Sequence, residues 1–301
     1  MSNDGRETFY LKHDLQNGFR SHECLSELAY ELKNTTSPKI TIDLSGVNFI
    51  ASNLFSVLGC ILYEFADRHP EPKALYINGI NNPITEIIQK NGFCKHLGLE
   101  KKPDVHNTVI PYMIFPVEQI DEYERYLTLN LFTRKDLPTM TREVSDTIRD
   151  SLLELFKNVS DHTTSEFVFT CGQYFPKSFM LYFTIVDIGE TVSYNVSNYH
   201  QAHYLTVPDN TLKWAMEAGN STSLSQKPRG IGLSLIKDFV SLNKGEFYIF
   251  SNDETYEIKR TKERFKKLNY PFPGTVVTIG FNLRDNAIYY LNSETYDTIQ
   301  F

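Results

Sequence analysis

The feature that most restricts the fold of this chain is an alternation of strand-like and helix-like patterns over residues 38–93. "KITIDL" is a short run rich in β-branched residues, and "KALYING" is a second strand-like run. "SNLFSVLGCILYEFADR" and "NPITEIIQKNGF" have the apolar spacing of helices, and the second ends at Gly92. Strands that alternate with helices predict an α/β layer fold for this region.

The length of 301 residues predicts two domains, because a domain usually holds roughly 100 to 200 residues. Hydrophobic residues make up 41% and aromatic residues 13% of the chain, which is typical of globular proteins. After Leu99 the sequence becomes charged and contains proline ("EKKPDVHN"), which indicates a boundary. We expect an N-terminal domain over 1–102, a connecting segment over 103–140 with one isolated strand-like run, and a second domain over 141–301.

Charge and cysteine spacing disfavour several classes of function. A formal net charge of −7 argues against a general binder of nucleic acids or membrane surfaces, because both are polyanionic. The four cysteines (Cys24, Cys60, Cys94 and Cys171) lack the short spacing of metal or redox motifs, so we expect reduced, mostly buried thiols. Neither a signal peptide nor a run of about 20 apolar residues stands out. We expect a cytoplasmic location and no membrane or nucleic-acid partner.

The second half of the chain begins with a long helical pattern over 141–162, followed by two strand-like runs that predict a hairpin over 167–186. Residues 190–228 have no firm period apart from one short helix, "NTLKWAMEAG". Segments of that length without regular structure are uncommon in compact domains and are usually functional. Two further strands, "GEFYIFS" and "GTVVTIGFNL", flank a charged excursion.

The helix over 141–162 separates apolar from polar residues. Its apolar face, which we expect to pack on a core, holds Val144, Ile148, Leu152, Leu155, Phe156 and Val159. Glu154, Asn158, Asp161 and His162 follow at helical spacing along another stripe. An amide oxygen is a ligand for a hard cation such as Mg²⁺, and a carboxylate one turn earlier can orient or deprotonate a nucleophile. The alternative interpretation of this stripe is a solvated polar face.

The segment "FTIVDIGETVS" places Asp187 at the end of an apolar strand, two residues before Gly189. A carboxylate at such a strand end can accept a hydrogen bond from an adenine amino group. The alternative is an ordinary turn built from aspartate and glycine.

The stretch "KPRGIGLSLIKDFV" joins two glycines to an amphipathic helix pattern. Glycines let the backbone approach a phosphate, and a helix N-terminus offers free N–H groups and the positive end of its dipole. The candidate residues here are Arg229, Gly230, Ile231, Gly232 and Leu233. Thr275, which follows Gly274 in "PFPGTVVTIGF", has a hydroxyl that can touch a phosphate. The alternatives are a glycine-containing helix start and a glycine turn before an edge strand.

In their order and spacing, these segments resemble the nucleotide-binding boxes of the GHKL superfamily, which includes DNA gyrase, the heat-shock chaperone ATPase, histidine kinases and mismatch-repair ATPases. "ELFKNVSDH" is similar to the N box, "DIG" to the G1 box, "RGIGLSLIKDFVSLNKGEFYI" to the G2 box and "GTVVTIGF" to the last strand. The resemblance extends roughly over residues 141–283. It implies the α/β sandwich of Bergerat-type ATP-binding domains, with ATP and Mg²⁺ as cofactors.

The resemblance also implies roles for single residues. Glu154 corresponds to the base that activates water or a hydroxyl, Asn158 to the Mg²⁺ ligand and Asp187 to the reader of adenine. Gly230 and Gly232 correspond to the phosphate-loop glycines, and residues 190–228 to an ATP lid. Thr191 stands where the family has its second G1 glycine.

The N-terminal region resembles a second family. "ITIDLSGVNFIASNLFSVLGCILYEF" and "ALYINGINNPITEIIQKNGF" are similar to STAS domains, the fold of anti-anti-sigma factors. Members carry an Asp-Ser pair at a helix start, and a GHKL-type kinase phosphorylates the serine. Here the pair is Ala51-Ser52, so Ser52 is a possible phosphoacceptor. A helix N-cap is the simpler interpretation of Ser52.

Three functions stay open at this point. The first is an ATP-dependent switch or ATPase coupled to the STAS-like module, and the second is a serine/threonine kinase of the anti-sigma type. The third is an interaction module that binds nucleotide without turnover. A histidine kinase is disfavoured, because residues 117–140 contain no histidine to accept a phosphoryl group. We expect a protein partner from signalling or transcription, and a homodimer is plausible.

Overall fold

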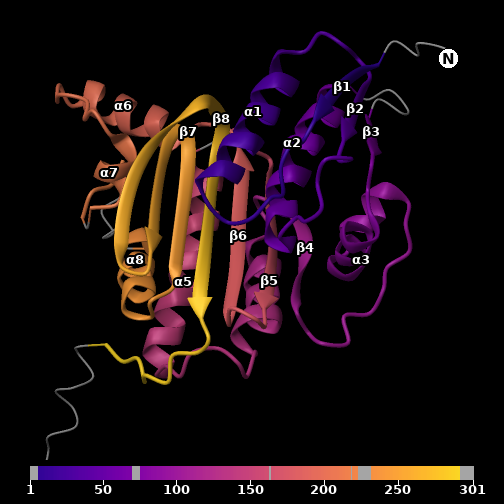
Figure 1. The fold of residues 1–301 in the computed structure, drawn as a ribbon. Coiled ribbons are helices and arrows are strands. Elements are labelled where there is room, and N and C mark those ends of the chain that lie inside the picture. The colour runs from indigo at the N-terminus through magenta and orange to yellow at the C-terminus, as the bar shows by residue number, and fades with distance from the viewer. Residues whose placement is uncertain (1–5, 70–74, 163, 218, 223–231, 292–301) are drawn as a thin grey trace, which may run out of the picture.

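The computed structural model describes residues 6–69, 75–162, 164–217, 219–222 and 232–291. In these ranges the protein is a mixed α/β structure with a parallel three-stranded sheet and an antiparallel five-stranded sheet (Figure 1). We call elements β1 to η2 the N-terminal unit and elements β4 to β8 the C-terminal unit.

The N-terminal unit confirms the predicted alternation of strands and helices, and it begins one strand and one helix earlier. Its strands are β1 (Glu7–Tyr10), β2 (Ile40–Asp43) and β3 (Leu75–Asn78), all parallel in the order β1-β2-β3. Its helical elements are α1 (Phe19–Asn34), η1 (Ser52–Leu54), α2 (Phe55–Arg68), α3 (Asn82–Asn91) and η2 (Phe93–Leu97). Asn81 caps α3, and Gly92 ends it in the left-handed conformation, as a helix-terminating glycine does.

The C-terminal unit holds the sheet β4-β5-β6-β8-β7. The predicted hairpin is confirmed as β5 (Phe167–Phe175) and β6 (Met180–Ile188). The strand-like run that we expected to be isolated is β4 (Val109–Pro116), which pairs with β5. Residues 103–140 therefore contribute an edge strand, α4 (Ile120–Leu127) and the π-helical turn η3 (Thr128–Phe132) to this unit.

The charged excursion between the last two predicted strands is itself strand. β7 (Glu246–Lys259) and β8 (Lys262–Asn282) form one long antiparallel hairpin. Arg260 and Thr261 make its turn, and both have positive φ, 49° and 70°. β8 lies between β6 and β7, so Thr275 sits in an interior strand, and the alternative interpretation of Gly274 and Thr275 as a turn before an edge strand is wrong.

Helices cover both faces of the five-stranded sheet (Figure 1). α5 (Arg142–His162) and α8 (Gly232–Leu242) pack on one face and share a core with Phe183, Ile249 and Val277. α1 and α2 fill the space between the two sheets, and their core includes Val186 and Val276 from the other face. The N-terminal unit is therefore packed on the sheet through a continuous hydrophobic core.

Residues 190–222 contain more helix than predicted. The expected short helix is α7 (Thr211–Ala215), and a second helix, α6 (Val192–Ala202), precedes it. Both lie beside β7 at the outer edge of the C-terminal unit (Figure 1). Every described helix is too short or too polar to cross a lipid bilayer.

Candidate functional site

A cavity of about 160 Å³ opens in the C-terminal unit. The residues around it come from α5, β6, α6, α7, α8, β7 and β8, and from the segments next to them. They are Ser151, Glu154, Leu155, Asn158, Val159, Ile185, Asp187, Glu190, Val192, Asn195, Val196, Trp214, Ala215, Ser221, Thr222, Leu233, Ile249, Thr275 and Val277. Segments that are far apart in the sequence thus meet around one space, and most of its walls are apolar.

Helix α5 supplies one polar side of the cavity. Its predicted apolar face is confirmed, since all six residues of that stripe are buried. Glu154 and Asn158, one turn apart, border the buried stripe, are half-buried and line the cavity. Asp161 is exposed and does not line it, and the side chain of His162 lies outside the described part of the structure.

Asp187 is the most unusual group in the cavity. Its side chain is only 4% exposed, and its Oδ2 atom has no hydrogen-bond partner among the described residues. Burial, and secondarily the negative charge of Glu190, raise the pKa of Asp187 to about 8. A buried carboxyl oxygen without a partner is costly, so a hydrogen-bond donor that enters the cavity gains by meeting it.

Thr275 lies directly beside Asp187 on the adjacent strand, because the two residues are paired between β6 and β8. Gly274 makes this close approach possible: a Cβ atom at that position would lie 2.0 Å from the Asp187 carbonyl oxygen. The glycine before Thr275 therefore serves strand packing beside the cavity, in a place where no larger residue fits.

Ser251 on β7 connects Thr275 to α6. Its Oγ atom donates to the Gly274 carbonyl at 2.8 Å, lies 2.9 Å from Thr275 Oγ1 and accepts from the Val192 N–H at 3.0 Å. Ser251 is fully buried. Sequence reasoning missed it, because a serine at the end of the apolar run "GEFYIFS" carries no motif.

The remaining predicted residues have mixed outcomes. Leu233 lines the cavity, and Gly232 begins α8. Gly189 does not line the cavity; its N–H donates to the Pro273 carbonyl at 3.0 Å. Arg229, Gly230 and Ile231 lie outside the described residues.

Other cavity residues were not predicted. Glu190 was within reach of sequence reasoning, because it directly follows the Asp187 motif. Trp214, the only tryptophan of the chain, stands out by composition, but nothing local connects it to Asp187. Asn195 belongs to α6, which lacked a clear helical pattern.

Ser52 lies away from this cavity, between the two units. It is fully buried, its N–H donates to Gln173 Oε1 at 2.6 Å, and its Oγ accepts from Asn91 Nδ2 at 3.0 Å. The N-cap position of η1 is Ala51 and no side chain caps the helix, so the interpretation of Ser52 as an N-cap is wrong. A phosphoryl donor could reach this hydroxyl only if the N-terminal unit separated from β5.

The predicted thiols are confirmed: all four cysteines are free, and Cys60, Cys94 and Cys171 are buried. Within the described ranges, no group of three His, Cys, Asp or Glu side chains is arranged to hold a metal ion. Comparison of the sequence with protein-family models and with curated proteins finds no match.

Proposed function

We propose that the chain binds ATP and Mg²⁺ as a GHKL-type regulatory protein, in which the nucleotide drives a conformational switch or is hydrolysed. The observation that carries this proposal is buried Asp187 Oδ2, which has no hydrogen-bond partner among the described residues and lies in an apolar cavity bordered by Glu154 and Asn158. These three residues are the ones for which the GHKL resemblance implies contacts with adenine, the activated nucleophile and Mg²⁺.

Asp187 fits the amino group of adenine. A flat aromatic base suits the apolar walls from Ile185, Val196 and Ile249, and its amino group can donate to the unpaired carboxyl oxygen. That contact would stabilise the ionised form of Asp187, whose pKa burial raises to about 8. Recognition of the base would therefore release a proton at neutral pH.

Glu154 and Asn158 would act at the phosphate side. Mg²⁺ usually binds one or two protein oxygens together with phosphate oxygens and water. The amide oxygen of Asn158 could therefore be the protein ligand of the ion. When bound, the ion would neutralise charge on the phosphates. Glu154, one turn earlier on the same cavity wall, would orient and deprotonate the attacking water.

A contact between the two units supports the coupling of the N-terminal unit, which resembles a STAS domain, to the proposed nucleotide site. Asn53 of η1 donates to Thr184 Oγ1 at 2.9 Å, and Thr184 lies on β6, the strand that ends at Asp187 and Ile188. A shift of β6 on nucleotide binding would reach the N-terminal unit through this contact. A kinase that acts on Ser52 of its own chain has less support, because that hydroxyl is buried.

Thermal unfolding with ATP, Mg²⁺ and matched nucleotides tests the proposal. Ligand at about 100 times its dissociation constant stabilises the folded state by roughly 2.7 kcal/mol, which raises the melting temperature clearly. Inosine triphosphate is the matched control, since it carries a carbonyl oxygen in place of the adenine amino group. We expect stabilisation by ATP that is much weaker with inosine triphosphate and weaker in Asp187→Ala. No shift with millimolar ATP would remove the nucleotide assignment.

A further inference from the structure

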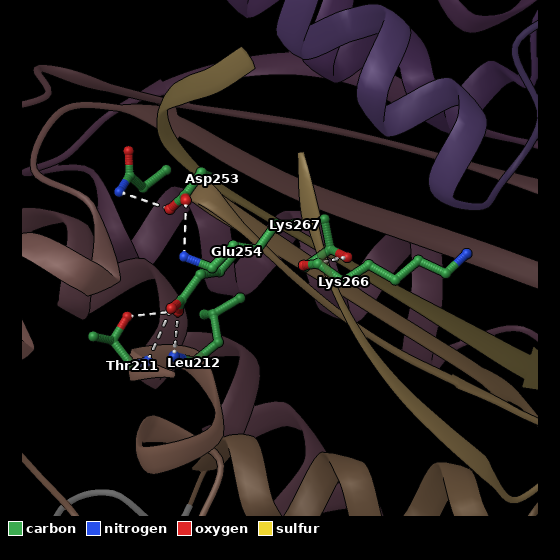
Figure 2. Close-up of polar contacts among 8 residues, drawn as sticks. Thr211, Leu212, Asp253, Glu254, Lys266 and Lys267 are labelled. Carbon is green, nitrogen blue, oxygen red and sulfur yellow. Dashed lines mark hydrogen bonds and ion pairs between the residues drawn. The ribbon is translucent and has the colours of Figure 1, made fainter. Parts of the chain in front are cut away.

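A carboxylate outside the predicted site fixes the cavity wall that α7 forms. Glu254 on β7 is 3% exposed, and its side chain reaches the first residues of α7 (Figure 2). Its Oε2 atom accepts from Thr211 Oγ1 at 2.7 Å and from the Leu212 N–H at 2.8 Å, and its Oε1 atom accepts from the Thr211 N–H at 3.2 Å. Three donors of one short helix thus end on one buried carboxylate.

These contacts satisfy the helix start almost completely. The first N–H groups of a helix have no partner within the helix, and negative charge is favourable beside them. Glu254 takes the first two, and Asn210 accepts the Lys213 N–H at 2.7 Å. α7 spans only Thr211–Ala215, so its own hydrogen bonds are too few to hold it in place.

The position of Trp214 depends on this attachment. Trp214 and Ala215 line the cavity, two and three residues after the Leu212 N–H that Glu254 holds. The indole is half-buried and meets the His200 ring of α6 edge-on, with centroids 4.9 Å apart. Leu212 is fully buried in the core of the C-terminal unit.

We infer that Glu254 is a positioning residue that fixes α7. Trp214 is thereby held in place as part of the cavity wall, where it determines which flat ligand fits the cavity. The part of this inference that concerns a ligand rests on the proposed nucleotide function, whereas the attachment of the wall does not. α7 would stay in place when a ligand enters, although it lies in the segment predicted as a lid.

Glu254→Gln tests the attachment, because it keeps the shape of the side chain but turns an NH₂ group toward backbone donors. Glu257→Gln is the matched control: Glu257 lies on the same strand, is 9% exposed and pairs with Arg264 at 3.3 Å. Fluorescence excited at the long-wavelength edge of the absorption band, where tyrosine does not absorb, reports on Trp214, which is the only tryptophan. We expect acrylamide to quench Trp214 more strongly in Glu254→Gln than in Glu257→Gln or the parent. Equal quenching in all three proteins would overturn the inference.

Calorimetric titration with ATP and Mg²⁺, at a temperature where every variant is folded, tests whether the wall contributes to ligand binding. If the wall is assembled only about one tenth of the time in Glu254→Gln, the apparent affinity falls about tenfold, and saturating ATP restores protection of Trp214. Lower thermal stability with unchanged affinity would mean that Glu254 is merely structural, which contradicts the inference.

If Glu254→Gln does not fold, Thr211→Val removes only the hydroxyl donor, and we expect the same two changes at smaller size. If the parent does not bind ATP, the proposed function fails, and Trp214 quenching alone supports or overturns the attachment of α7.

Discussion

Two buried ionisable side chains, His22 and Asp187, lie on opposite faces of the five-stranded sheet, and their surroundings differ. His22 of α1 is 2% exposed, stacks on Phe250 with ring centroids 4.3 Å apart and meets Tyr248 edge-on. Its Nε2 atom lacks a hydrogen-bond partner in the described part of the chain, as does Asp187 Oδ2. Asp187 instead borders a cavity. A buried atom without a partner is accessible to a ligand only where open space adjoins it, as at Asp187, and not where aromatic rings enclose it, as at His22.

The pKa values show that burial drives both groups to their neutral forms. Burial lowers the pKa of His22 from 6.5 to about 3, and it is the main cause that raises the pKa of Asp187 from 3.8 to about 8. The two groups should therefore make stability depend on pH in opposite directions. Each direction can be tested by a substitution that keeps shape and removes titration.

The largest expected effect belongs to Asp187→Asn. Between pH 3.8 and about 8 the unfolded chain ionises this carboxyl while the folded chain keeps it protonated. The free energy of unfolding therefore falls as pH rises through this window, by at most about 1.4 kcal/mol per pH unit. Asp187→Asn should remove this loss, so its advantage over the parent in urea unfolding should grow from pH 5 to pH 8. If the difference in the free energy of unfolding between Asp187→Asn and the parent did not change with pH, the pKa of Asp187 would not be raised, and water would have to reach the carboxyl group.

The next effect belongs to His22→Phe, which keeps a ring between Tyr248 and Phe250. As pH falls from 6.5 to about 3, the unfolded chain takes up a proton that the folded chain excludes. The free energy of unfolding therefore falls with pH, again by at most about 1.4 kcal/mol per unit. His22→Phe should be less sensitive to acid than the parent in thermal unfolding at pH 4 to 6. The affinity for ATP at pH 7 should stay unchanged, and a large loss would contradict the contrast between the two faces.

The smallest expected effect concerns a contact between the two units. Asn53→Ala removes the amide that donates to the Thr184 hydroxyl, which keeps its 2.7 Å contact to Thr278 Oγ1, and it also removes the 2.8 Å hydrogen bond to Asn17 Oδ1. The change should cost about 1 to 3 kcal/mol of stability. If β6 couples the faces, the ATP affinity should also change by a few fold, since coupling energies are typically about 1 to 3 kcal/mol. Asn81→Ala, which removes the cap of α3, is a control of similar stability cost at a distance from β6. Equal ATP affinity in both variants would show that the N-terminal unit is not energetically coupled to the ATP site.

Much of the fold could be predicted from the sequence because its signals are local. The apolar stripe from Val144 to Val159 repeats at helical spacing, and every member is buried. The hairpin of β5 and β6 follows from two strand-like runs with a short connection. Asp187 is recognisable from the sequence because a carboxylate at the end of an apolar strand is unusual wherever that strand lies. Glu154, Asn158, Thr275 and Leu233 also came from patterns within single segments.

Tertiary contacts decided the rest, because pairing and burial depend on residues far apart in the chain. In the sequence β4 is an isolated strand-like run, and only its pairing with β5 makes it part of the sheet. The charged residues of β7 and β8 form strands because the two strands of the hairpin hydrogen-bond to each other. Ser251 and Glu254 have no local signal: their partners, Val192 and Thr211, are 59 and 43 residues away. The sequence by itself determined which residues have the chemistry of a site. Only the packing of α5, α7 and the sheet around one cavity determined that Asp187 Oδ2 has no partner in the described part of the chain and that Trp214 forms part of the wall.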